Sequence, residues 1–350
     1  MENKKSTAAV QMKEIAEKLG VSSGTVSIVL NGRGDQMRIS QATQKRIQDM
    51  AKEMNYQPNI YARRLRKSAQ EEAPYIIAVF WREEYLDDLL GRFLKGLYLT
   101  IKQNNINMEL VLQPYDFGKL DKYKQSINSN HYNGAIIGGI SNEDQQFLEE
   151  NEFDIPIILI GRSTKKYSGV LIDYYDAGEK CANLFYARKH KTVGLVGLST
   201  KGKSVQIIEL AFKETCKEKG ILIDPNYISY CKGRDFNSGY ESTMNILANE
   251  VKPTALFIMD ERNAVGVLKA CKTVGLNIPE DIEILVFGEN EYFSYSEPTL
   301  TTIQQPMEQF AEKSLNMIMI LIKNKVDLPM IQELNPIIHF RESCGGFTES

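Results

Sequence analysis

The sequence predicts a small all-α helix-turn-helix head at the N-terminus, followed by an α/β core with parallel, doubly wound sheets. Residues 10–54 carry apolar side chains at helical spacing, and from Tyr75 onward short β-like apolar runs alternate with helical stretches. Residues 1–70 hold 13 Lys and Arg against 6 Asp and Glu, a net charge of +7, while the remainder carries −10. A basic head on an acidic body is typical of a nucleic-acid-binding module joined to a second module. The length of 350 residues suggests two or three domains.

Composition excludes several classes of protein. The five cysteines are scattered and form no C-x-x-C pair, and there are only three histidines, so neither a disulfide framework nor a metal centre is indicated. No apolar run is long enough to span a membrane, and the N-terminus lacks the apolar core of a signal peptide, so we expect a cytoplasmic protein. No catalytic arrangement of Ser, His and Asp or of paired carboxylates stands out. We therefore expect neither an enzyme nor a cofactor.

The head is predicted to contain three helices. In the first helix the apolar residues at helical spacing are Met12, Ile15, Ala16 and Leu19. Gly20 ends this helix. Ser22 can cap the second helix, which turns Val26, Val29 and Leu30 inward. This arrangement leaves five residues near the outer face or the N-terminal end: Ser23, Gly24, Thr25, Ser27 and Ile28. A third amphipathic helix follows the cap residue Ser40. Two helices joined by a short turn containing glycine predict a helix-turn-helix.

Residues 55–70, NYQPNIYARRLRKSAQ, follow the head. Pro58 ends the third helix, and Asn59 begins a short segment with Ala62 and Leu65 on one side and basic side chains elsewhere. This segment is too short to be a stable helix in isolation. The composition also fits an ordinary charged linker.

The core alternates strand-like and helical stretches. The expected strands are YIIAVF, MELVLQ, GAIIGG, PIILIG, GVLI, TVGLVG, YISYC, ALFIM and IEILVF. This alternation predicts parallel sheets with helices on both faces.

Residues 197–204, GLSTKGKS, match the phosphate-binding loop pattern G-x-x-x-x-G-K-[ST] between an apolar run and a helical segment. Asp260, which ends LFIMD, fits the strand-end aspartate that holds magnesium in such enzymes. A nucleotide-hydrolysing enzyme is therefore one alternative. The other interpretation is a tight turn with a solvated Lys203.

The chain as a whole resembles the LacI/GalR family of bacterial transcription regulators. The resemblance begins with GVSSGTVSIVLNG, ISQATQKRI and NYQPNIYARRLR, and continues through IPIILIGR, IDYYDAG, PTALFIMDERNAVG, GLNIPEDIEILVFGE, PTLTTIQQP and FRESC. It implies a head over residues 1–57, a hinge helix and linker over 58–73, and two α/β lobes like those of a periplasmic binding protein. The first lobe would comprise 74–172 with 298–330, and the second 173–297 with 331–345.

The resemblance implies roles for residues of the head. Ser22, Thr25, Ser27 and Asn31 match positions that hold phosphates, and Ser23, Gly24 and Ile28 match positions that meet base edges in the major groove. Gly24 and Ile28 depart from the polar residues usual at those positions, which favours a non-standard half-site or readout of DNA shape. The stretch GRGDQMR is longer than usual, so Arg33 and Arg38 either contact phosphates or lie in a plain surface loop.

The resemblance implies that the hinge segment controls whether the protein binds its operator. The resemblance makes Leu65 the apolar wedge that enters a minor-groove step, with Asn59, Ala62 and Arg63 beside it. Leu65 could instead be a minor core contact.

The resemblance also implies an effector, a small molecule bound between the lobes. Phe236 matches the aromatic platform for the ligand, or packs in the core. Gln206, Asp260 and Gly288 occupy positions where the family usually has Arg, Asn and Asp. Trp81 and Tyr85 are candidate stacking partners or structural residues. The loss of Arg and Asp, with the gain of Asp260, favours a hydroxyl-rich or cationic ligand.

These features predict a dimeric regulator, most often a repressor in this family, that binds pseudo-palindromic double-stranded operator DNA. Its effector would be a sugar or another polar metabolite. The alternatives are the nucleotide-hydrolysing enzyme built on Gly197–Ser204 and a solute-binding protein without a role on DNA.

Overall fold

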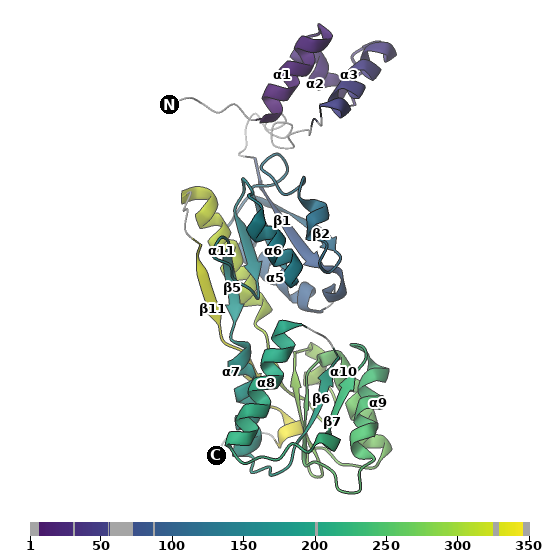
Figure 1. Cartoon of the computed structure of the whole chain (residues 1–350), viewed down its shortest axis with the longest axis vertical. Coiled ribbons are helices and arrows are strands. Elements are labelled where there is room, and N and C mark those ends of the chain that lie inside the picture. Colours follow the sequence, from purple (N-terminus) through teal and green to yellow (C-terminus); the bar gives the residue numbers. More distant parts are fainter. Residues whose placement is uncertain are drawn as a thin grey trace.

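The computed structural model describes residues 7–30, 32–54, 56, 73–86, 88–199, 202–324 and 329–345. The head contains α1 (Thr7–Leu19), α2 (Ser23–Leu30) and α3 (Gln41–Glu53), which confirms the three predicted helices (Figure 1). They enclose a small apolar core of Ile15, Ala16, Val26, Val29, Ile47 and Ala51. Gly20, at φ +65°, ends α1 in the left-handed conformation that favours glycine.

Side-chain caps fix the starts of the second and third helices. Ser22 Oγ accepts a hydrogen bond from the Thr25 amide at 3.0 Å, and Ser40 Oγ accepts one from the Thr43 amide at 3.3 Å. The loop between α2 and α3 is held to α3, because Gln44 Nε2 donates to Asp35 Oδ1 at 2.9 Å and to the Ile39 carbonyl at 2.8 Å. The longer loop is thus an ordered part of the head.

The first lobe is built on a six-stranded parallel sheet in the order β11-β5-β4-β3-β1-β2. Its strands are β1 (Tyr75–Arg82), β2 (Met108–Tyr115), β3 (Gly134–Gly138), β4 (Ile157–Ile160), β5 (Ser168–Ile172) and β11 (Ile331–Leu334). Helices α5 (Asp88–Gln103) and α11 (Met307–Asn324) share one apolar core with the sheet. The opposite face is covered by α6 (Asn142–Glu150) and η2 (Leu120–Tyr123). A short helix η1 (Glu83–Tyr85) follows β1.

The second lobe repeats this arrangement with the order β12-β10-β9-β8-β6-β7. Its strands are β6 (Gly194–Leu198), β7 (Ile228–Cys231), β8 (Ala255–Ile258), β9 (Glu283–Phe287), β10 (Thr301–Gln304) and β12 (Ile337–His339). Among these strands only β12 runs antiparallel to its neighbour, β10. Helices α7 (Tyr174–Ala187) and α8 (Lys203–Glu218) cover one face, and α9 (Phe236–Leu247) and α10 (Glu261–Thr273) the other. Short helices η3 (Pro225–Tyr227), η4 (Glu291–Ser294) and η5 (Glu342–Cys344) complete the lobe. The predicted doubly wound α/β core is confirmed.

Two strands lie in the lobe opposite to the one expected. β10 was expected in the first lobe, within 298–330, but pairs with β9 in the second sheet. β11 was expected in the second lobe, within 331–345, but pairs with β5 in the first sheet. Both segments are short and weakly apolar: TTIQ is largely polar, and three of the four residues of IQEL are exposed. The chain therefore passes between the lobes after Ile172, before Met307 and between Leu334 and Ile337.

Candidate functional site

The exposed start of α2 is the first candidate site. Ser22, Ser23 and Gly24 are exposed, and Thr25 and Ile28 are partly exposed, so a ligand can approach the first turn of the helix. A Cβ on Gly24 would meet only Ser22 Oγ, at 3.5 Å, which leaves open space over the backbone there. Arg33 and Arg38, in the loop after α2, are both exposed. This surface combines the N-terminal end of a helix, hydroxyl groups and cations, the groups that bind phosphate.

Ser27 corrects the sequence-based prediction. It was expected near the outer face, but only 9% of its surface is exposed, and it lies beside the core residue Val26. The helix has eight residues, so a small rotation about its axis is enough to turn one position inward. Asn31, Asn59, Ala62, Arg63 and Leu65 lie outside the described residues, and their roles remain predictions.

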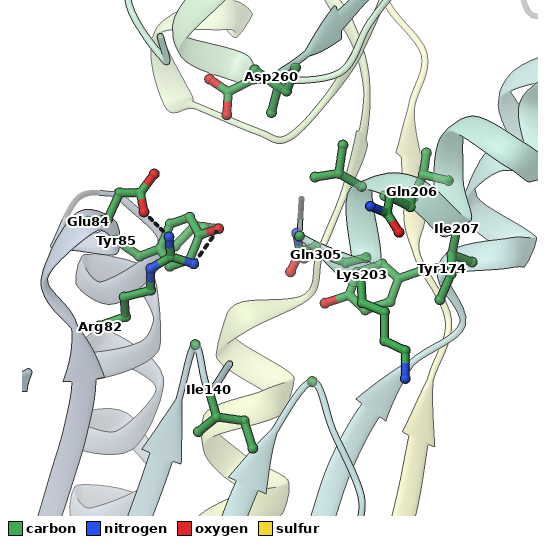
Figure 2. Close-up of a pocket in the computed structure, with 18 of the residues that line it drawn as sticks. Arg82, Glu84, Tyr85, Ile140, Tyr174, Lys203, Gln206, Ile207, Asp260 and Gln305 are labelled. Atoms are coloured by element: carbon green, nitrogen blue, oxygen red, sulfur yellow. Dashed lines mark hydrogen bonds and ion pairs between the residues drawn. The ribbon is translucent and has the colours of Figure 1, made fainter. Parts of the chain in front are cut away.

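A cleft of about 1060 Å³ between the lobes is the second candidate site. Its walls are formed by residues at the carboxyl ends of β1, β3, β4, β6, β7 and β8, with the starts of α7 and α8. Figure 2 shows Arg82, Glu84 and Tyr85 on one side of this space and Lys203, Gln206 and Tyr174 on the other. The carboxyl edge of an open α/β sheet is where such folds bind small ligands.

Tyr85 lies at the junction of the two lobes. Its ring is contacted by Arg82 of the first lobe, 4.7 Å from the centroid, and by Arg234 of the second lobe, 4.9 Å away. Burial raises the pKa of the Tyr85 hydroxyl, against the opposing effect of the two arginines. The predicted residue Trp81 lines the same wall but is 4% exposed, packs on Phe93 and donates from Nε1 to the Tyr85 carbonyl at 2.9 Å. Trp81 is therefore chiefly a wall residue that supports Tyr85.

Asp260 lines the cleft as predicted but is not available to a ligand. Arg234 Nε donates to its carboxylate at 2.5 Å, and Asp260 also caps α10 by accepting from the Arg262 amide at 3.0 Å. Arg234 also pairs with Glu261 at 3.4 Å. Asp260 was expected to favour a cationic or hydroxyl-rich ligand; in this structure its side chain is 4% exposed and already paired with Arg234.

Two other predicted effector residues lie outside the cleft. Phe236 is the first residue of α9, is 43% exposed and stacks on Tyr240 with centroids 6.4 Å apart. Arg234, two residues earlier, takes the place in the cleft expected for that ring. Gly288 has φ +112°, and a Cβ there would lie 2.2 Å from the Glu261 carboxylate. Glycine is needed at that position to make room for Glu261. Gln206 does line the cleft.

Sequence reasoning missed Tyr174 and Arg162. Tyr174 begins α7, and a Cβ on Gly161 would lie 3.3 Å from its hydroxyl. Burial raises the pKa of Tyr174, so this hydroxyl stays protonated and can donate a hydrogen bond. Arg162 follows β4 and also faces the cleft. Both residues lie in stretches that carry the family resemblance, IPIILIGR and IDYYDAG, but neither residue was given a role there.

The first glycine of the match to a phosphate-binding loop lies in a strand rather than in a loop. Gly197 lies within β6, and a Cβ on it would meet the Tyr230 ring at 2.7 Å, so this glycine accommodates an aromatic side chain. Asp260, the expected magnesium ligand, is paired with Arg234. No group of His, Cys, Asp or Glu suited to a metal ion occurs among the described residues. The alternative of a nucleotide-hydrolysing enzyme is not supported.

Comparison with known families accounts for both modules. Residues 11–59 match the model of bacterial regulatory proteins of the lacI family, and residues 182–344 match that of the periplasmic binding protein-like domain. The chain thus joins a head that matches the lacI family to a core that matches the periplasmic binding protein-like domain. The match to a regulatory head also disfavours a solute-binding protein without a role on DNA.

Curated relatives are similar to this chain over nearly their whole length. The chain is 26% identical to catabolite control protein A of Priestia megaterium over 351 residues, covering 95% of this chain and 99% of the relative. It is 24% identical to the transcriptional repressor CytR of Escherichia coli K12 over 318 residues, covering 90% of each.

Solved structures share the fold. A LacI family transcription regulator from Clostridium acetobutylicum is 29% identical with a TM-score of 0.72, covering 77% of this chain and 99% of that one. The lac repressor dimer bound to operator and the anti-inducer ONPF is 19% identical with a TM-score of 0.68, covering 95% and 98%. Within the described part of the chain, no helix is long and apolar enough to cross a membrane.

Proposed function

We propose that this LacI-family protein is a sequence-specific DNA-binding transcription regulator, acting as a repressor, whose affinity for its operator is set by a small molecule in the cleft. The observation that carries the proposal is a basic three-helix head with an exposed α2 N-terminus, joined in one chain to two lobes around a cleft of about 1060 Å³. The relatives named above are regulators, and the family model covers the head.

In the DNA complex, α2 would lie in the major groove. Ser22, Thr25 and Asn31 are proposed to hold phosphates, and Ser23, Gly24 and Ile28 to meet base edges. Gly24 has no side chain with which to read a base, and Ile28 can only pack on a thymine methyl, so DNA shape would supply part of the specificity. Leu65, with Asn59, Ala62 and Arg63, is proposed to enter the minor groove at the centre of the site.

We propose that the protein acts as a homodimer on a pseudo-palindromic site. The first lobe exposes apolar side chains on α5 and on the edge strand β2: Tyr98 is 62% exposed, and Leu99 and Leu112 are each 41% exposed. Such surfaces are typical of protein interfaces. One structure of the same fold is a lac repressor dimer on its operator, and another is CelR in complex with cellobiose. These complexes support a dimer and a polar effector.

The effector would act by changing the equilibrium between two lobe orientations, which in turn controls the segment that joins the head to the core. The contact between Arg234 and Tyr85 lies across the cleft, so a ligand there would alter it directly.

The test is selection of bound duplexes from a random DNA pool by the full-length protein. We expect enrichment of an inverted repeat with a deformable central step. Leu65→Ala should lose that enrichment, whereas Leu210→Ala, at a position 52% exposed on α8, should keep it. No enrichment by the wild type at low salt, with or without candidate ligands, would overturn the proposal.

A further inference from the structure

We propose that the loop between α2 and α3 is a second DNA contact of each head. Its two arginines, Arg33 and Arg38, bind backbone phosphates beside the base pair that Ile28 meets. This inference rests on the proposed function, because it adds a contact surface to the same head. It concerns the stretch GRGDQMR, which is longer than usual in the family and to which that function assigns no role.

The C-terminal end of α2 fixes the position of Arg33. The Arg33 amide donates to the Ile28 carbonyl at 3.0 Å, and the Gly32 amide donates to the Val29 carbonyl at 2.9 Å. Gly32 has φ +70°, so these bonds form the glycine-containing motif that commonly ends a helix. The loop therefore begins directly on the turn of α2 that carries Ile28. A duplex in contact with Ile28 also lies next to the start of the loop.

Hydrogen bonds close the loop and bring its two ends together. The Ile39 amide donates to the Gly34 carbonyl at 2.9 Å, and the Arg38 amide donates to the Asp35 carbonyl at 3.1 Å. Because residues 34 and 39 are bonded, the residues before them, Arg33 and Arg38, leave the loop from neighbouring points on the backbone. Both side chains are exposed, so the loop presents two cations from one place.

The one carboxylate of the loop is held to α3. Asp35 Oδ1 accepts hydrogen bonds from Gln41 Nε2 at 2.7 Å and from Gln44 Nε2 at 2.9 Å. Neither Arg33 nor Arg38 forms an ion pair with a carboxylate of the described residues. The charges of both arginines are therefore available to an anion outside the protein.

Arg38 has a backbone conformation that is unusual for its side chain. Its φ is +55°, in the left-handed region that favours glycine and asparagine. Either of those residues would form the turn more readily than arginine does, so the turn itself does not explain the arginine. Residues other than glycine in this conformation gather at functional sites. A positive side chain at this position fits a role in binding phosphate.

Duplex DNA is the partner that this surface fits. The loop continues from the helix proposed to enter the major groove, and residues 1–70 carry a net charge of +7, which attracts a polyanion. The stretch GRGDQMR contains no aromatic residue on which the bases of a single strand would stack. Arginine contacts to phosphate add affinity without reading sequence. The loop is therefore expected to strengthen binding to every duplex equally.

The test measures how the DNA affinity of the full-length protein depends on salt. Fluorescence anisotropy gives the affinity for the selected operator and for a random duplex at about 50 to 200 mM sodium chloride. The variants are Arg33→Gln and Arg38→Asn, because asparagine tolerates the left-handed conformation. Arg38→Lys keeps the charge. The matched control is Lys52→Gln, an exposed cation in the last turn of α3, at the end of that helix away from the loop.

Each phosphate contact contributes about 0.9 to the slope of log affinity against log salt. We expect Arg33→Gln and Arg38→Asn each to reduce this slope by about 0.9 per head, or about 1.8 for the proposed homodimer. The affinities for the operator and for the random duplex should fall by the same factor, about tenfold or more at low salt. Arg38→Lys and Lys52→Gln should keep the wild-type slope.

Three results would overturn the loop contact. The first is a slope that neither loop variant changes. The second is a loss of affinity for the operator alone, because a phosphate contact acts on every sequence. The third is an equal loss in Lys52→Gln, which would make the effect one of total charge on the head.

The same measurements separate this inference from the proposed function. If the wild type selects an operator and the loop variants keep its slope, the loop contact is wrong and the regulator stands. If the wild type selects no sequence but binds random duplex with a slope that the variants reduce, the sequence-specific regulator is wrong and the loop contact stands. No binding of the wild type to either duplex would overturn both.

Discussion

The pair of Arg234 and Asp260 allows a quantitative prediction. The two side chains are 14% and 4% exposed, and the N–O distance is 2.5 Å. Removing one partner of a buried ion pair costs about 3–5 kcal/mol. Because Arg234 keeps some contact with solvent, we expect Arg234→Gln to cost about 2–3 kcal/mol of unfolding free energy.

Asp260→Asn removes the negative charge and keeps the cap of α10, because asparagine caps a helix about as well as aspartate. Arg234 then keeps Glu261 as a partner at 3.4 Å, so we expect this change to cost only about 1 kcal/mol. In the double variant the charge of Asp260 is gone as well, and only Glu261 is left without Arg234. The cost of the double variant should stay near that of Arg234→Gln alone, which gives a coupling energy of about 1 kcal/mol.

The assay is urea unfolding followed by far-UV circular dichroism, since the single tryptophan lies in the first lobe and does not report on this pair. Lys269→Gln, an exposed cation on α10, is the matched control and should change stability by less than about 0.5 kcal/mol. If the costs of the two single changes simply add in the double variant, the pair is not coupled. Asp260 would then be free to bind an effector, and the reasoning about the cleft would be refuted.

Three further predictions concern the head, the first lobe and pH. Gly96→Ala places a Cβ 2.8 Å from the Glu308 backbone on α11 and should lower the free energy of unfolding by about 1–3 kcal/mol, measured by Trp81 fluorescence in urea. At Gly91 an added Cβ meets nothing within 4 Å, so Gly91→Ala should stabilise by up to about 1 kcal/mol; a change of the same sign in both variants would contradict the packing. Ser40→Ala removes the α3 cap and should cost the head about 1 kcal/mol in thermal unfolding, with Ser40→Asp as the restoring control; an unchanged midpoint would show that the cap is dispensable. Burial lowers the pKa of His339, so around and below the ordinary pKa of about 6.5 the unfolded chain binds more protons than the folded one. The free energy of unfolding should therefore fall as pH drops through that range, and His339→Gln should flatten this dependence of stability on pH.

Much of the fold was predictable because the signals were local. Each apolar run predicted as a strand forms one, and the glycine and serine residues at the helix ends of the head act as expected. β10 and β11 were assigned to the wrong lobes because their side chains are polar or exposed, and because lobe membership depends on pairing with a strand distant in the sequence.

The cleft was less predictable than the fold. The partner of Asp260 is 26 residues away in the sequence, and no local pattern brings them together. Phe236 was expected in the cleft because it matches the family's aromatic platform, but its ring is 43% exposed outside the cleft, and Arg234 lines the cleft instead. The bonds from Arg162 to Asn142 and Gln145 join the end of β4 to α6, and only the three-dimensional structure shows them.

The three passages of the chain between the lobes have a consequence for folding during synthesis. The apolar face of the first sheet is covered in part by α11, whose residues are made only after nearly all of the second lobe. Until Met307–Asn324 leaves the ribosome, side chains such as Ile77 and Ile136 lack the packing that α11 supplies. The second lobe therefore acquires most of its sheet before the first lobe can close, and a nascent chain halted near residue 300 would present an open apolar face to chaperones.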